Sequence, residues 1–469
     1  MFTKLWAENF KSWRSLGPID LAPVTALFGT NSSGKTSILQ ILLLVKQTAE
    51  SADRSQVLNL GDERTAIDLG SFNDLVFDHI GNAEIDFGFS WELDDQLKPK
   101  EPLLESEFLA DSKTLTFWAE VAQGTGKTLE VRRLSYTNSG NSAVEISRSS
   151  QATSRKTSEY DMTAHVAGQN YLKRVVGRSW PLPPPIKCYG FPEEAIAYFQ
   201  NAGFVKDLEL ELDRQFTGRV FYLGPLRSDP EREYRWKGTH PQDVGVTGEK
   251  AVEVLLASRD EPKSNFRTRG KTGKKSKLIS LEVHVAQWLQ ELELVSNFDV
   301  RQLSLDSDIY RVSVRRTPHS PEVFLTDVGF GVSQVLPVLV LLASAPEGAT
   351  VLLEQPEIHL HPSVQSGLAD IIIETAIHRR VQVIVESHSE HLLRRLQLRT
   401  AEETIRPGDI SLYFCDASTG ESTIEALQLN LFGEISNWPT DFFGDPLKET
   451  ASIVKAGIKR KRKIAYEAQ

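Results

Sequence analysis

The sequence predicts an α/β fold in two unlike parts, a lobe of mixed strands and a lobe built on a parallel sheet covered by helices. Two patterns predict this class. Between residues 83 and 136, three segments alternate partly between apolar and polar residues and are bounded by polar turns, which is typical of strands. From residue 298 to residue 415, apolar segments of strand length alternate with segments of helix length, which favours a largely parallel sheet.

The individual elements follow from local patterns. Residues 2–28 predict two short strands around a turn at Gly17-Pro18, and residues 35–49 have the length and apolar spacing of a helix. Residues 137–170 are rich in Ser, Thr, Asn and Gly and predict a long loop. Further helices are expected near 192–216, 280–294, 332–344, 363–378 and 389–398, and further strands near 220–223, 298–304, 309–316, 349–354, 381–386 and 410–415.

The composition bounds the class of protein. The chain has 469 residues, which is too many for one ordinary core, and two or three lobes are therefore expected. Hydrophobic residues make up 40% and charged residues 25%, as in ordinary globular proteins. The net charge is −10, whereas a chain dominated by affinity for nucleic acid is basic. Any contact with nucleic acid must therefore come from a local basic patch.

Cysteine usage and the apolar segments indicate the compartment. Two cysteines, Cys188 and Cys415, cannot build a disulfide framework or a cysteine-rich zinc site, which favours a reducing environment. Residues 1–10 lack the apolar core of a signal peptide. The longest apolar segment, residues 335–345, is well short of a membrane span. We therefore expect a cytoplasmic protein with no membrane partner.

A phosphate-binding loop is the strongest local signal. Residues 29–36 read Gly-Thr-Asn-Ser-Ser-Gly-Lys-Thr and lie between a predicted strand and a predicted helix. The two glycines let the backbone fold around an anion, and the helix N-terminus adds unpaired N–H groups. Lys35 is expected to reach the β- and γ-phosphates of ATP, and Thr36 to place its hydroxyl on Mg²⁺. The predicted binding residues are Gly29, Asn31, Ser32, Ser33, Gly34, Lys35, Thr36 and Ser37.

Two carboxylates follow a later apolar strand. Residues 350–357 read Thr-Val-Leu-Leu-Glu-Gln-Pro-Glu. At the carboxyl edge of a parallel sheet such groups face a bound phosphate. We expect Glu354 to hold Mg²⁺ or its waters, and Glu357 to polarise the attacking water as a catalytic residue.

A histidine follows the next predicted strand, which ends at Glu386. His388 is expected to contact the γ-phosphate, while Ser387 or Ser389 is expected to cap a helix, and both interpretations hold at once. The spacing of the histidines between residues 359 and 391 matches no standard zinc site.

Residues 327–334 read Asp-Val-Gly-Phe-Gly-Val-Ser-Gln before a very apolar helix. Gly329, Gly331 and Ser333 at that helix N-terminus predict a second anion-binding edge, although the segment read alone predicts only a turn and a cap.

Taken in order, these motifs resemble the ATPase heads of the ABC superfamily, in the lineage of RecF, structural-maintenance-of-chromosomes and overcoming-lysogenization-defect proteins. Residues 8–14 and 28–37 are similar to the first strand and Walker A of these heads. Residues 354–362 look like Walker B and the D-loop, residues 386–391 like the H-loop, and residues 327–334 stand in the place of the signature. The resemblance extends to ATPases of prokaryotic anti-phage defence of the Septu- and retron-associated types, and it covers about half the chain.

The resemblance implies a head with an inserted α/β arm region. The predicted segments are an N-terminal ATPase lobe over 1–90, an inserted region over 91–219, a C-terminal ATPase lobe over 220–427 and a tail over 428–469. It also implies a head-to-head homo-oligomer, in which Gly329, Gly331 and Ser333 of one copy cover the ATP held by the other. Two departures are Glu354, where such heads usually carry Asp, and the altered order of the signature.

Three functions remain in competition. The first is an ATPase that regulates a separate effector, a nuclease or toxin, in anti-phage defence. The second is a RecF-like repair ATPase that binds nucleic acid through a basic loop, for which a solvated loop is the plainer interpretation. Its candidate residues are Arg267, Arg269, Lys271, Lys274 and Lys275. The third is a nucleotide-gated scaffold with weak catalysis, which Glu354 and the altered signature motivate.

Overall fold

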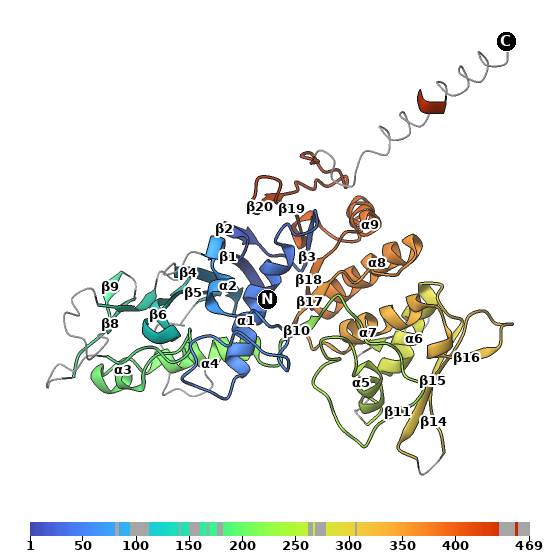
Figure 1. Cartoon of the computed structure of the whole chain (residues 1–469), viewed down its shortest axis with the longest axis horizontal. Coiled ribbons are helices and arrows are strands. Elements are labelled where there is room, and N and C mark those ends of the chain that lie inside the picture. Colours follow the sequence, from blue (N-terminus) through green and yellow to red (C-terminus); the bar gives the residue numbers. More distant parts are fainter. Residues whose placement is uncertain are drawn as a thin grey trace.

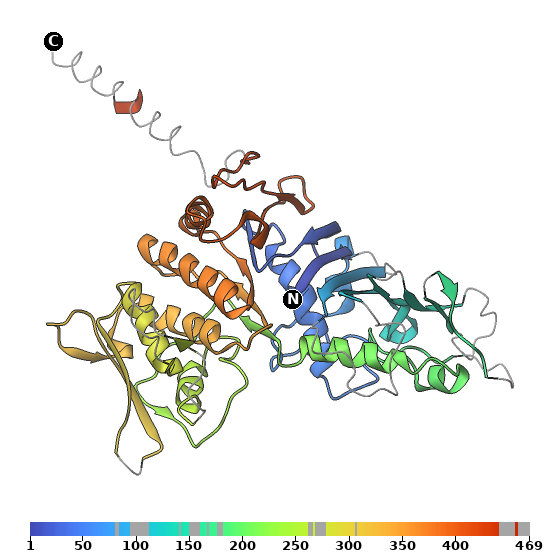
Figure 2. The same cartoon turned by 180° about the vertical axis from the view of Figure 1, so that it is seen from behind.

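The computed structural model describes residues 1–79, 84–93, 112–139, 142–149, 160–166, 168–175, 182–260, 266–267, 278–304, 307–439 and 455–457. A strand-rich part extends to one side of a central layer, and a smaller part of helices and hairpins extends to the other (Figure 1). The view from behind shows the same arrangement (Figure 2). The predicted fold class, a mixed β lobe beside a parallel α/β lobe, is confirmed.

The strand-rich part is an antiparallel sheet. Its described strands lie in the order β2-β1-β4-β5-β6-β7-β8-β9. Their bounds are β1 (Phe2–Phe10), β2 (Trp13–Asp20), β4 (Glu84–Glu92), β5 (Thr114–Gln123), β6 (Leu129–Asn138), β7 (Ala143–Arg148), β8 (Tyr160–Val166) and β9 (Gln169–Asn170). The prediction of a loop over residues 137–170 is therefore wrong, because β7 and β8 lie within it. This sheet takes strands from both sides of residue 90, and the predicted segment boundaries stay predictions.

An aromatic cluster fixes one face of this sheet against a helix. Phe216 closes α4 (Phe204–Phe216), and its ring centroid lies 5.3 Å from that of Phe2 and 5.1 Å from that of Phe89. All three side chains are fully buried. Edge-to-face and tilted aromatic pairs add stabilisation beyond the area they bury. The cluster therefore anchors β1, whose chain leads through β2 into the phosphate-binding loop.

Three carboxylates face one another across neighbouring strands of this sheet. Asp86 of β4 lies opposite Glu8 of β1 on one side and opposite Glu120 of β5 on the other, and Glu120 in turn lies opposite Arg133. Like charges directly opposite each other destabilise a sheet. Burial, followed by the charges of Glu8 and Glu84, raises the pKa of Asp86 to about 6. Burial and Glu84 raise the pKa of Glu120 to about 7.

We expect this row to make the folded protein less stable as the pH rises. The protonated carboxyls are favoured in the folded state, so their contribution is full below pH 4 to 4.5 and is lost as pH rises through about 6 and 7. The melting temperature should be lower at pH 8 than at pH 5.5. At pH 8, Asp86→Asn should raise the free energy of unfolding by about 1 kcal/mol. The gain is small because solvent screens the charges of these half-exposed groups. Thermal unfolding at both pH values measures this.

Glu92→Gln on the same strand, where Glu92 faces Thr114, is the matched control and should leave the pH dependence unchanged. An unchanged pH dependence in Asp86→Asn would contradict the assignment.

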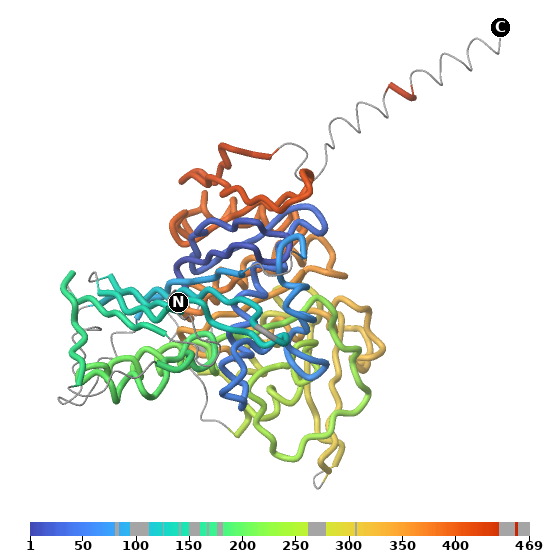
Figure 3. The backbone as a smooth tube through the Cα atoms, turned by 60° about the vertical axis from the view of Figure 1, so that its left-hand side comes forward, coloured from blue at the N-terminus to red at the C-terminus, as the bar shows by residue number. Residues whose placement is uncertain are grey.

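The central layer is a second sheet, and it brings together segments far apart in the chain. Its described strands lie in the order β10-β17-β18-β3-β19-β20, all parallel to their neighbours except β20. Their bounds are β3 (Val24–Gly29), β10 (Val220–Leu223), β17 (Thr350–Glu354), β18 (Gln382–Glu386), β19 (Ile410–Asp416) and β20 (Thr423–Ala426). N-terminal strands, drawn in blue, accordingly lie beside C-terminal segments, drawn in orange and red (Figure 3). The predicted strand–helix alternation in a parallel sheet is confirmed for residues 349–415, whereas the predicted strands near 298–304 and 309–316 pair antiparallel in a separate sheet.

Helices cover both faces of the central sheet. Leu27, Leu352 and Ile384 share a buried cluster with the helix that follows the loop, while Ala26 and Val383 on the opposite face pack into a second cluster. These helices are α1 (Lys35–Glu50), α7 (Phe330–Ser344), α8 (Pro362–Arg379) and α9 (Glu390–Ala401). Since β3, β10, β17 and β18 are buried on both faces, their side chains are almost continuously apolar. No described helix is both long enough and apolar enough to cross a membrane.

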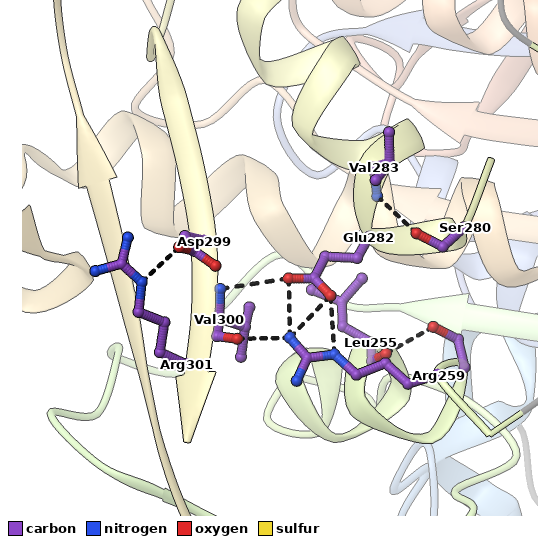
Figure 4. Close-up of polar contacts among 9 residues, drawn as sticks. Leu255, Arg259, Ser280, Glu282, Val283, Asp299, Val300 and Arg301 are labelled. Atoms are coloured by element: carbon purple, nitrogen blue, oxygen red, sulfur yellow. Dashed lines mark hydrogen bonds and ion pairs between the residues drawn. The ribbon is translucent and has the colours of Figure 1, made fainter. Parts of the chain in front are cut away.

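The smaller part is tied together by one arginine. Arg259, just beyond α5 (Ala251–Ala257), donates from Nε and Nη2 to the Glu282 carboxylate of α6 at 2.9 and 3.0 Å, and from Nη2 to the Val300 carbonyl at 2.5 Å (Figure 4). Glu282 also accepts the Val300 N–H at 3.3 Å. The remaining elements here are α6 (Leu281–Glu291), β11 (Tyr234–Arg235), β14 (Asn297–Gln302), β15 (Ile309–Arg315) and β16 (Glu322–Phe324). This bidentate contact joins two helices to β14.

Three local predictions differ from the structure. Residues 2–28 hold three strands, and the chain reverses at Lys11-Ser12, whereas Gly17-Pro18 lies inside β2. The predicted helix over 192–216 is divided into α3 (Glu193–Tyr198) and α4. The short elements α2 (Phe72–Leu75), β12 (Phe266–Arg267) and β13 (Leu278–Ile279) have no counterpart in the sequence analysis.

Candidate nucleotide-binding site

The glycine loop joins β3 to α1, and its glycines occupy positions that a side chain cannot enter. A Cβ on Gly29 would lie 2.0 Å from the Cys415 carbonyl oxygen, and one on Gly34 would lie 2.6 Å from Ser12 Oγ. Gly34 also has a φ of 84°, in the left-handed region that favours glycine. Trp13 Nε1 donates to the Gly34 carbonyl at 3.0 Å. The loop is therefore held in one conformation by the strands beside it.

The side chains of the loop divide by exposure. Asn31 and Ser32 are exposed at its tip, while Ser33 and Ser37 are buried. Lys35 is also buried, and its Nζ donates to the Thr30 carbonyl at 2.6 Å and to the Gly29 carbonyl at 3.3 Å. Burial lowers the pKa of Lys35, and the charge of Glu386 opposes this shift. The ammonium is thus held over the loop by neutral oxygen acceptors.

Thr36 binds a carboxylate that the sequence analysis did not single out. Its Oγ1 donates to Glu386 Oε2 at 2.7 Å. Glu386 is the last residue of β18 and lies directly beside Glu354, the last residue of β17. The same signal was present in both cases, a carboxylate ending an apolar strand. Glu354 and Glu386 together, rather than Glu354 alone, therefore present carboxylates near the Thr36 hydroxyl.

Glu354 is buried among polar neighbours from another strand. The Tyr222 hydroxyl of β10 donates to Glu354 Oε1 at 2.9 Å. Burial, followed by the charge of Glu386, raises the pKa of Glu354 to about 7. A carboxylate in this position gains from a cation that neutralises both groups.

Glu357 has one satisfied and one free oxygen. Oε1 accepts the His388 N–H at 2.6 Å, whereas Oε2 is buried with no hydrogen-bond partner among the described residues. Burial raises the pKa of Glu357, against the His388 N–H bond. A buried polar atom without a partner is costly and calls for a bound group or water.

His388 lies beside the loop, half-buried. Burial and the Lys35 charge lower its pKa, so its imidazole is neutral near pH 7, and the Gly29 carbonyl opposes the shift. Ser389 caps α9, because its Oγ accepts the Leu392 N–H at 3.0 Å. The helix cap formed by Ser389 and the position of His388 beside the loop are therefore compatible.

The charged groups at the carboxyl edge of the central sheet, around the glycine loop, are not paired with one another. They are Lys11, Lys35, Arg227, Glu354, Glu357 and Glu386. Within the described ranges none of the six has an ion-pair partner within 4.0 Å. Burial lowers the pKa of Lys11, and the charges of Asp74 and then Glu354 oppose this shift. Unpaired charges in a buried site are expensive, and such groups are retained where a charged ligand completes them.

This donor set fits Mg·ATP. A hydroxyl and carboxylates suit Mg²⁺, and the cations suit phosphate oxygens. Among the described residues there is no group of three or more His, Cys, Asp or Glu side chains close enough to hold a metal by themselves. A magnesium ion here would therefore need phosphate oxygens and water as additional ligands, as is usual for this ion.

The residues of the predicted signature make no polar contact with the loop among the described residues. Gly329 precedes α7 and has open space around its Cα, while Gly331 packs near the His359 carbonyl. Ser333 is buried, and its Oγ donates back to the Phe330 carbonyl at 3.1 Å. In the described part of the chain, no hydrogen bond or ion pair joins residues 329–333 to residues 29–36.

The nucleic-acid candidates have no described side chains. Arg269, Lys271, Lys274 and Lys275 lie outside the described residues, and Arg267 is described only as backbone in β12.

Comparisons with known proteins agree with the class of the site. Residues 250–394 match the family described as "AAA domain, putative AbiEii toxin, Type IV TA system", and residues 405–453 match "Protein of unknown function (DUF3696)". The chain therefore contains an ATPase-type domain, and this match includes Glu354, Glu357 and His388. No curated protein matches the chain.

Solved structures of SMC heads are similar to the chain over most of its length. The SMC head domain from Thermotoga maritima is 13% identical, with 91% of this chain and 99% of that chain covered and a TM-score of 0.39. An Smc head bound to the C-winged helix domain of ScpA is 12% identical, with 92% and 98% covered and a TM-score of 0.43. An Smc head with an extended coiled coil, bound to the C-terminal domain of ScpA derived from Pyrococcus furiosus, is 10% identical, with 91% and 96% covered and a TM-score of 0.42.

Proposed function

We propose that the chain binds Mg·ATP at the carboxyl edge of the central sheet and hydrolyses it. The observation that carries this proposal is the set of unpaired cations and carboxylates around the glycine loop. The N–H groups of the loop and Lys35 bind the phosphates, and the Thr36 hydroxyl, which donates to Glu386 in this structure, would serve as a ligand of Mg²⁺. Glu354 and Glu386 hold the metal or its waters, and Mg²⁺ when bound neutralises developing phosphate charge.

The chemical step uses groups of this chain. Glu357 takes a proton from the attacking water through its free Oε2, since its Oε1 is held by the His388 N–H. Neutral His388, beside Gly29 and Lys35, donates a hydrogen bond to the terminal phosphate. Burial raises the pKa of Glu357, and this brings the pKa of the base closer to the pH at which the protein works.

The site is completed by a second copy of the chain. Support comes from residues 329–333, which have no hydrogen bond or ion pair to the loop of their own chain among the described residues, and from Phe330 within this segment, which is 66% exposed. A large apolar side chain exposed at a helix N-terminus fits a surface that association covers. ATP therefore draws two heads together, and hydrolysis releases them.

Self-association is tested with Gly329→Glu. Gly329 has open space around it and a φ of −58°, so a side chain is tolerated there, but a carboxylate would repel the phosphates of the other copy. The variant should bind ATP as a monomer while losing ATP-dependent dimers and turnover. Gly408→Glu, at a glycine with equally open space, is the matched control. Light scattering with ATP and with ADP measures the dimer. If Gly329→Glu dimerises with ATP as strongly as the wild type, the proposed self-association is wrong.

The biological role is regulation of a separate effector, a nuclease or toxin, in prokaryotic defence. The family matched by residues 250–394 carries a toxin–antitoxin system in its description, which supports a role of this kind. Co-purification of the chain with the product of the neighbouring gene, in the presence and absence of ATP, tests it. An adjacent repair gene and DNA binding that weakens steeply with salt would favour the RecF-like alternative instead.

A further inference from the structure

Arg227 is a part-buried cation whose hydrogen bonds go to neutral groups. Nη1 donates to the Gly224 carbonyl and Nη2 to the Glu354 carbonyl, the latter at 3.3 Å. Nε is buried with no hydrogen-bond partner in the described ranges. Guanidinium groups in protein interiors normally pair with a carboxylate or a phosphate, because burying an unpaired charge is costly.

The fold places this arginine at the nucleotide edge. β10 runs parallel to β17, with Leu223 beside Leu353, so the residues that follow β10 emerge at the same edge as Glu354. Burial lowers the pKa of Arg227, and Tyr222, Glu354 and Glu357 oppose this shift; Glu354 and Glu357 are the groups assigned above to the metal and the attacking water. Arg227 therefore lies against Glu354 at the carboxyl edge of the central sheet, and it reaches that edge from β10 rather than from β3, which carries the glycine loop.

The backbone around Arg227 is fixed on both sides. The Gly224 N–H donates to the Val246 carbonyl at 2.8 Å, and the Ser228 N–H donates to the Thr247 carbonyl at 2.9 Å. Ser228 Oγ and Thr247 Oγ1 are also hydrogen-bonded, at 2.6 Å. A guanidinium presented from so restrained a segment loses little freedom when it binds an anion.

We propose that Arg227 binds the terminal phosphate of ATP within the same chain and thereby distinguishes ATP from ADP. The inference rests on the proposed ATP site. Lys35 and the glycine loop hold the phosphates from β3, and Arg227 closes on the γ-phosphate from β10. Its planar group with several donors suits phosphate oxygens, and its main-chain contacts hold it next to Glu354 until the phosphate arrives.

Arg227→Gln removes the charge while keeping an amide that can donate to the two carbonyls. We expect the affinity for a non-hydrolysable ATP analogue with Mg²⁺ to fall about 10- to 100-fold, which is the effect of losing one charge-assisted contact. The affinity for ADP should change less than about threefold. Calorimetry with both nucleotides measures this, and thermal unfolding without nucleotide shows that the variant is folded. Arg235→Gln, an exposed arginine on β11, is the control.

If Arg227→Gln does not fold, Arg227→Lys serves as the test instead. Lysine keeps the positive charge but lacks the planar guanidinium that can contact two oxygen atoms at once. Arg227→Lys should weaken binding of the ATP analogue alone, by about 3- to 10-fold. Equal losses for ATP analogue and ADP would overturn the proposal and make Arg227 structural, and so would unchanged affinity for both. A wild-type chain that binds neither nucleotide would instead refute the proposed function itself.

Discussion

Glu357→Gln is expected to abolish ATP turnover while leaving ATP bound. The amide has the shape of the carboxylate and still accepts the His388 N–H, but it cannot take a proton from water. Loss of a general base lowers kcat by about 10²- to 10⁴-fold. Because the variant also removes a buried ionisable group, the nucleotide-free protein should not be destabilised. Phosphate release measures kcat, and calorimetry measures ATP affinity.

Glu390→Gln is the matched control, since Glu390 is the first residue of α9 and pairs with Arg394 at the surface. It should retain wild-type turnover. Turnover of Glu357→Gln within about threefold of wild type would remove Glu357 from the mechanism. If the wild-type chain binds ATP and shows no turnover under any condition, the nucleotide-gated scaffold becomes the better description. Measuring ATP affinity and phosphate release together therefore distinguishes a defect in ATP binding from a defect in hydrolysis.

Lys35→Met is expected to lower the affinity for ATP and for ADP together, by roughly 100-fold. The ammonium is buried over the loop and pairs with no carboxylate of the described residues, so its charge is available to both the β- and the γ-phosphate. Methionine keeps much of the packing volume of the lysine stem. Loss of both nucleotides distinguishes this variant from Arg227→Gln, which should affect ATP alone.

Lys46→Met provides the control on the same helix, because Lys46 is engaged with Glu50 at the far end of α1. Its ATP affinity should equal that of the wild type. ATP affinity of Lys35→Met within about threefold of wild type would show that the glycine loop does not bind the phosphates. Titrations with and without Mg²⁺ should further show that the lysine contact does not require the metal.

Sequence patterns predicted the parallel sheet well because each element there is locally consistent. β17 and β18 are short apolar segments that end in a carboxylate, and α1 follows a loop with glycines at fixed positions. Burial on both faces makes such strands continuously apolar, which a single sequence reveals. The strands β7 and β8 were missed because only two residues of β7 and three of β8 alternate into the core, between segments of turn-forming residues.

The sequence by itself determined that this chain carries a phosphate-binding loop, acidic strand ends and a histidine in the order of an ATPase head. Tertiary structure decided which carboxylate meets the Thr36 hydroxyl, since Glu386 lies 350 residues further along the chain. It also decided that Tyr222 and Arg227 lie against Glu354. Local patterns carry no information about such pairs, because parallel strands from distant segments meet only when the sheet assembles. The charge balance of the site is therefore a property of the fold.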